Sequence, residues 1–173
     1  ALSHINCGEV IESHLEAPPM GVASTRVLIG RKFGTVLTSS AGYPLDKTYY
    51  QTVKCMVTPL DIVAEGGTII VVSACSEGIG SEEYRSAQER LVRDGPDAFL
   101  QSLLAKDFAD IDEWQTEMQL KSTRATRVQL YTTGLKGADR GITGVEMIDS
   151  VEEALAQALA RSPGGGLAVI PEG

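Results

Sequence analysis

Apolar residues follow two patterns along most of this chain, unbroken runs and stripes at helical spacing. The unbroken runs are rich in β-branched residues and predict strands buried on both faces of a parallel sheet, over 33–40, 68–75 and 127–133. Stripes spaced three and four residues apart predict helices over 48–57, 81–94, 97–106 and 151–161. The two patterns alternate, as in proteins in which helices connect parallel strands.

Shorter apolar runs complete this alternation. They predict strands over 144–148 and 167–171, and the glycine pair Gly66-Gly67 is predicted to open the strand that follows it. Because crossovers between parallel strands are right-handed and place helices over the sheet, the order predicts an α/β fold. We expect a Rossmann-like three-layer sandwich with a mostly parallel sheet.

The first 32 residues carry a weaker pattern. We interpret 1–32 as an N-terminal extension or partial segment, followed by an α/β domain over 33–173. Pro18-Pro19 is predicted to break any helix that runs from Glu9 to Glu16, because proline lacks the N–H that a helix interior needs. The apolar residues of 26–29 favour a short strand.

Composition restricts the classes of partner. The chain has 173 residues and a net charge of −8, the opposite of the basic footprint of a nucleic-acid-binding protein. No apolar run approaches the roughly 18 residues that span a bilayer, so no membrane partner is predicted. Widely spaced Cys7, Cys55 and Cys75 indicate a reducing, cytoplasmic location, with the last two in the core. His4, Cys7 and His14 lack the paired spacing of metal ligands, so no metal site is predicted.

A turn rich in glycine and proline follows the first predicted strand. It contains Gly42 and Tyr43, and either Asp46 or Thr48 can cap the next helix. Ligands of α/β sheets bind at the carboxyl ends of the strands. This turn is therefore a possible pocket element.

The helix after this turn carries three polar side chains that could bind an anion. Tyr50 and Lys54 are four residues apart and share a face, with Gln51 three residues before Lys54. A phenol, an amide and an ammonium can all donate hydrogen bonds to one carboxylate. The alternative is a solvated helix face with an ordinary lysine, and the spacing alone favours this alternative.

A second glycine turn follows the strand over 68–75. Gly78 and Gly80 match the start of a dinucleotide fingerprint, but the third glycine and the downstream acid are missing, which favours a plain tight turn. As a pocket element it would line the same site as the first turn. The nucleotide-binding interpretation is the weaker one.

The single tryptophan lies at the predicted start of a helix. Asp112 is predicted to cap this helix, with Gln115 reaching back, so Trp114 falls in the first turn. The nearby acids, Glu113 among them, are interpreted as helix-start and solvating charges. A lone tryptophan usually packs in a core, whereas one at a helix mouth can form a pocket wall.

The segments GYPLDKTYYQTVKCM, IVAEGGTIIVVSACSEGIGSEEY and DEWQ together resemble the C-terminal domain of the nickel-pincer (nickel-dependent) lactate racemase family. The resemblance extends from Thr35 to Trp114, and follows the layout alone elsewhere. It implies that Tyr50, Gln51, Lys54 and Trp114 bind the substrate, a small 2-hydroxy acid, for a racemase or epimerase.

The resemblance also implies a division of labour. In the family, a cofactor-bearing N-terminal domain holds the nickel-pincer nucleotide and supplies the histidine bases. No histidine lies within the resembling region, so this chain is expected to bind no cofactor and to be inactive alone. The N-terminal domain would then be supplied in cis or in trans. The alternative function is a non-catalytic α/β module that binds a small acid or a partner.

Overall fold

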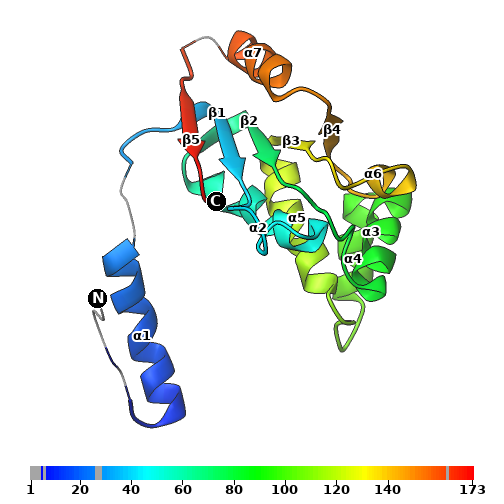
Figure 1. Ribbon diagram of the computed structural model, residues 1–173. Coiled ribbons are helices and arrows are strands. Elements are labelled where there is room, and N and C mark those ends of the chain that lie inside the picture. Colours follow the sequence, from blue (N-terminus) through cyan, green and yellow to red (C-terminus); the bar gives the residue numbers. More distant parts are fainter. Residues whose placement is uncertain (1–4, 6, 26–28, 163) are drawn as a thin grey trace. The chain divides into compact units, whose positions relative to one another are not determined.

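The computed structural model describes residues 5, 7–25, 29–162 and 164–173 (Figure 1). The chain divides into two compact units, Ala1–Gly30 and Arg31–Gly173. No helix in the part of the chain so described is long and apolar enough to cross a membrane.

The described residues of the first unit form one helix, α1 (Val10–Thr25), and the predicted break at the proline pair is wrong. Pro18 and Pro19 lie inside the helix. Each proline removes one helical N–H donor, but its fixed φ of about −65° is itself compatible with a helix, so the chain continues through both. Of the strand predicted over 26–29, residues 26–28 lie outside the described residues, and so does His4.

The second unit is built on one parallel sheet. Its strands are β1 (Phe33–Ser39), β2 (Val63–Val72), β3 (Arg127–Tyr131), β4 (Glu146–Ile148) and β5 (Leu167–Ile170). Their order in the sheet is β4-β3-β2-β1-β5, and every neighbouring pair is parallel. The prediction that the three long apolar runs are neighbours in one parallel sheet is confirmed.

Helices cover this sheet. In chain order the second unit has α2 (Tyr49–Val57), a 3₁₀ turn (Thr58–Asp61), α3 (Glu82–Asp94), α4 (Pro96–Leu104), α5 (Glu113–Ala125), α6 (Ala138–Gly141) and α7 (Val151–Arg161). Thr48, Ser81 and Ser150 cap α2, α3 and α7 with their hydroxyls, so that Thr48 is the cap used of the two that the sequence allows for α2. The short helix α6 has no counterpart among the predicted elements.

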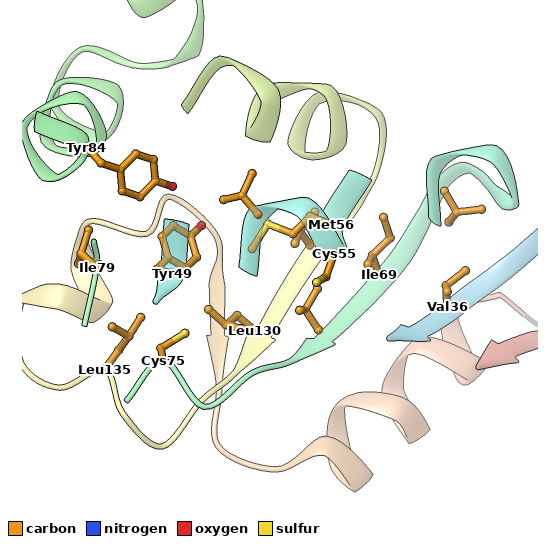
Figure 2. Packing of buried hydrophobic residues seen from close by; sticks show 14 of the residues in the cluster. Val36, Tyr49, Cys55, Met56, Ile69, Cys75, Ile79, Tyr84, Leu130 and Leu135 are labelled. Atoms are coloured by element: carbon orange, nitrogen blue, oxygen red, sulfur yellow. The ribbon is translucent and has the colours of Figure 1, made fainter. Parts of the chain in front are cut away.

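The two faces of the sheet bury alternate residues of β2. Ile69 and Val71 pack against α2 in the main core. This core also contains Tyr49, Met56 and the other residues labelled in Figure 2. Ile70 points to the opposite face, where it packs with Ala154 and Ala158 of α7. This period of two separates the layers α2/α5, sheet and α7, and it confirms the predicted α/β sandwich. Cys55 and Cys75 are buried in the main core, as predicted.

The glycine pair does not open β2, which corrects another prediction. The strand begins at Val63, and its register with β1 shifts between the pairs Phe33↔Val63 and Thr35↔Thr68. The pair lies in this bulge, where a Cβ on Gly67 would come within 2.8 Å of the Ala64 carbonyl oxygen. At the other end β2 stops at Val72, three residues earlier than predicted.

The carboxyl ends of β2 and β3 approach each other closely at Gly134. Its N–H donates to the Ala74 carbonyl (2.9 Å), and a Cβ there would overlap the Cys75 carbonyl oxygen.

We expect Gly134→Ala to lower the free energy of unfolding by at least about 2 kcal/mol, because the obstructing atoms belong to the backbone. Gly141→Ala is the matched control, since a Cβ at that position would meet nothing within 4 Å. Urea denaturation of both variants tests this; equal stabilities would contradict it.

Candidate functional site

The amino end of α2 is closed by the second glycine turn. The N–H groups of Tyr49 and Tyr50 donate to the carbonyls of Gly78 and Ile79 at 2.9 Å each. The next N–H is capped by the Thr48 hydroxyl. Since a helix leaves its first N–H groups free unless something caps them, these bonds remove the usual anion-binding donors. A ligand here must be bound by side chains.

The two glycine turns are joined to each other as well. Cys75 N–H donates to the Asp46 carbonyl (2.8 Å) and Glu77 N–H to the Lys47 carbonyl (2.7 Å). Lys47 and Glu77 also form an ion pair at 3.1 Å. The Asp46 carboxylate accepts from Ala74 N–H instead of capping α2, so Thr48 is the cap. These contacts fix the start of α2 relative to the sheet.

Tyr50, Gln51 and Lys54 lie together on one face of α2. Lys54 Nζ donates to Gln51 Oε1 at 2.8 Å and lies 5.8 Å from the centre of the Tyr50 ring. Lys54 is exposed, and it forms no ion pair with any of the carboxylates that the structure describes. Its charge is therefore available to an anion, and the Gln51 amide retains its N–H donors.

Trp114 lies beside Tyr50, although 64 residues separate them in sequence. The two ring centres are 6.1 Å apart with an interplanar angle of 89°, and the tryptophan is 47% exposed. Tyr84 packs edge-on against Tyr50 as well, at 5.1 Å. Tyr50 is thus supported by aromatic edges, while Trp114 forms a partly open wall.

Hydrogen bonds between α5 and α2 produce this proximity. Three polar side chains at positions 115, 119 and 122 share one face of α5. They pair with α2 as Gln115 Nε2 to the Tyr50 carbonyl (2.7 Å), Gln119 Oε1 with the Tyr49 hydroxyl (3.1 Å) and Ser122 Oγ to the Met56 carbonyl (2.7 Å). The start of α5, which carries Trp114, is thereby held against the face of α2 that carries Tyr50.

The start of α5 corrects two predictions. Asp112 occupies the capping position, but with φ 64° and without a side-chain capping bond; its carboxylate accepts from Ser81 Oγ at 2.6 Å. Gln115 donates to α2 and does not reach back. Burial, followed by the negative charge of Asp112 and a hydrogen bond with it, raises the pKa of Tyr50 above its ordinary value. Sequence reasoning missed Asp112 as a site residue, because its partner Ser81 is 31 residues away.

Glu113 is buried, not solvated as predicted. Only 1% of its side chain is exposed, and it pairs with Arg90 (2.5 Å) and Lys106 (2.7 Å). Burial by itself would raise the pKa of Glu113, but Lys106, the Asp110 N–H and Arg90 together lower this pKa to about 2. This cluster anchors the residue next to Trp114.

The possible pocket turns divide into two groups. Gly78 and Gly80 contact α2: Gly78 through its carbonyl, and Gly80 because a Cβ there would lie 3.1 Å from Tyr50 Cβ. Gly42 and Tyr43 are exposed, Tyr43 to 76%, and among the described contacts none joins them to Tyr50, Gln51, Lys54 or Trp114. The second turn is thus part of the candidate site, whereas the first supports α2 from a distance.

Comparison with known proteins gives a consistent result. Residues 31–173 match the family described as the lactate racemase C-terminal domain. Lactate racemase of Lactiplantibacillus plantarum is 30% identical over 142 residues, covering 79% of this chain and 32% of that protein. Lactate racemase of Thermoanaerobacterium thermosaccharolyticum is 43% identical over 49 residues, covering 28% of this chain and 12% of that protein.

A solved structure shows the same fold. The structure of the lactate racemase apoprotein from Thermoanaerobacterium thermosaccharolyticum superimposes with a TM-score of 0.76 at 23% identity. The match covers 92% of this chain and 38% of the other. The chain therefore spans at most about two fifths of the length of the relatives it matches.

The Glu113 cluster generates a pH-dependent prediction. We expect Glu113→Gln to lower the free energy of unfolding by about 3 kcal/mol at pH 7, because Arg90 and Lys106 lose a buried partner. The folded pKa of about 2 lies below the ordinary value of 4.5. The stabilisation is therefore complete above pH 4.5 and is lost as the pH falls towards 2.

Denaturation of wild type and variant at pH 7, 4 and 3 measures this difference. Asp97→Asn is the matched control, because Asp97 and Arg124 form an exposed pair at 3.3 Å, worth less than about 0.5 kcal/mol. A difference between wild type and Glu113→Gln that stays constant with pH would contradict the assignment of the cluster.

Proposed function

The chain belongs to the lactate racemase C-terminal domain family, and from this premise we propose that it is the substrate-clamping domain of a racemase or epimerase acting on a small 2-hydroxy acid. The observation that carries the proposal is the gathering of Tyr50, Gln51, Lys54 and Trp114 at one surface. Lys54 binds the substrate carboxylate, Gln51 and Tyr50 add hydrogen bonds, and Trp114 forms a wall.

The local electrostatics support this assignment. The N–H groups at the start of α2 are already bonded, so Lys54 is the positive group that a carboxylate meets on this face. Charge-assisted hydrogen bonds are about twice as strong as neutral ones. Holding a reacting carbon in a fixed orientation can lower a barrier by up to roughly 7–11 kcal/mol.

The reaction needs more than this chain supplies. Among the described residues, no group of three or more His, Cys, Asp or Glu side chains could hold a metal ion. A nickel-pincer nucleotide therefore does not fit the donor set found here, and we assign it to a cofactor-bearing N-terminal domain in cis or in trans. The present chain contributes binding and orientation. Its free cysteines support a reducing, cytoplasmic setting.

The clamp is tested in an enzyme that contains both domains. We expect Lys54→Met to lower kcat/KM for lactate at least about 100-fold, since the charge-assisted bond is lost while the side-chain volume is kept. Trp114→Ala should reduce it by about tenfold, because the wall loosens and the charge stays. Lys121→Met on α5 is the control and should behave as wild type. A normal kcat/KM for Lys54→Met would refute the clamp.

Assays of the 173-residue chain, first alone and then with an N-terminal domain, distinguish this function from the alternative of a non-catalytic binding module. We expect it neither to retain nickel after dialysis nor to racemise lactate, and to racemise lactate once the separately produced N-terminal domain with its cofactor is added. Metal analysis and chiral chromatography are the measurements. Binding of lactate without racemisation in the reconstituted mixture would favour the module.

A further inference from the structure

Asp112 has a left-handed backbone conformation. At φ 64° and ψ 0° it is one of three non-glycine residues with positive φ among those described, a region that costs a non-glycine residue energy. An aspartate at a helix start normally caps its own helix, which this one does not. The backbone instead turns the carboxylate away from α5 and towards α3.

Ser81 fixes the carboxylate on that side. Its hydroxyl accepts the Tyr84 N–H (3.1 Å) as the cap of α3 and donates its single proton to Asp112 Oδ2 (2.6 Å). Both hydrogen-bonding roles of the hydroxyl are therefore used. The Asp112 carboxylate is thereby held at the start of α3.

Tyr50 lies between the two segments that this bond joins. A Cβ on Gly80, the neighbour of Ser81, would lie 3.1 Å from Tyr50 Cβ. On the other side, the Trp114 ring centre is 6.1 Å from that of Tyr50, and Gln115 Nε2 donates to the Tyr50 carbonyl. Burial raises the pKa of Tyr50, and the negative charge of Asp112 raises this pKa further.

We propose that Asp112 is a positioning residue of the clamp. Its bond to Ser81 joins the starts of α3 and α5, the two segments that flank the Tyr50 side chain, and so holds this side chain in place. The inference rests on the proposed function in one respect, namely that Tyr50 contacts the substrate. It extends that function by naming the group that orients the phenol. Asp112 itself does not touch the substrate; its effect passes through Tyr50.

This role predicts non-additive kinetics. In an enzyme with both domains, Asp112→Ala should lower kcat/KM for lactate about tenfold, but less than about twofold when Tyr50→Phe is already present. Ser81→Ala should give a smaller loss that also vanishes in the Tyr50→Phe background. Asp97→Asn is the control. Losses that simply multiply would show that Asp112 does not act through Tyr50 and would overturn the proposal.

A second measurement is independent of activity. Tyrosines of the 173-residue chain are labelled with ¹³C at the phenol carbon and titrated by NMR, and Tyr50→Phe assigns the Tyr50 signal. Asp112→Asn keeps the shape and an acceptor for Ser81 but removes the charge, so the Tyr50 pKa should fall. An unchanged Tyr50 pKa in a folded Asp112→Asn chain would overturn the proposal.

The two measurements separate the possible failures. If Lys54→Met leaves catalysis intact while Asp112→Asn lowers the Tyr50 pKa, the proposed function is wrong, but the influence of Asp112 on Tyr50 is confirmed. If Lys54→Met abolishes catalysis and the titration does not respond, the clamp stands and the role of Asp112 is wrong.

Discussion

The hydrogen bonds between α5 and α2 are the constraint on which the site depends. Gln119 is fully buried and donates to the Thr143 carbonyl (2.7 Å), and the Tyr49 hydroxyl shares its proton between this carbonyl (2.7 Å) and Gln119 Oε1 (3.1 Å). Gln88 of α3 donates to the same Gln119 oxygen (3.0 Å). Buried polar groups are costly when unpaired, so such a network tolerates few alternative arrangements. It therefore fixes the register of the two helices, which apolar packing alone would define less sharply, and with it the distance from Tyr50 to Trp114.

Much of the fold could be predicted, because its signals are local. An unbroken β-branched run predicts a strand such as β2, and the turn before an amphipathic stripe predicts a helix start, as at α2, where it leaves Asp46 and Thr48 as the two possible caps. The bulge at Gly67 could not be predicted, since it depends on how β2 aligns with β1. The predicted helix break at the proline pair was wrong for another reason. Helix propensity gives the free-energy cost of a proline, but it does not show whether the rest of the helix compensates for this cost.

The residues of the candidate site also differ in how far they could be predicted from local sequence. The spacing of Tyr50 and Lys54 on one helix face follows from sequence, because neighbours at i and i+4 need no tertiary information. Asp112, Glu113 and Gln115 were misjudged, because each is polar and lies at a helix start, where capping or solvation is the ordinary role. Their actual partners are distant in sequence. The one available signal was the spacing of positions 115, 119 and 122, a polar stripe on the face of α5 that turns out to be buried.

The local charges at this surface are compatible with the binding of a small acid. With a net charge of −8, the chain as a whole repels a carboxylate. At physiological ionic strength, however, exposed charges beyond about 8 Å are largely screened, so the immediate surroundings decide the local potential. Lys54 has the neutral Gln51 amide as its partner, whereas Lys106 and Arg90 are neutralised by Glu113. A cation without a carboxylate partner next to an open aromatic wall therefore distinguishes this face from the ion-paired positions Arg90 and Lys106 as a place for an anion.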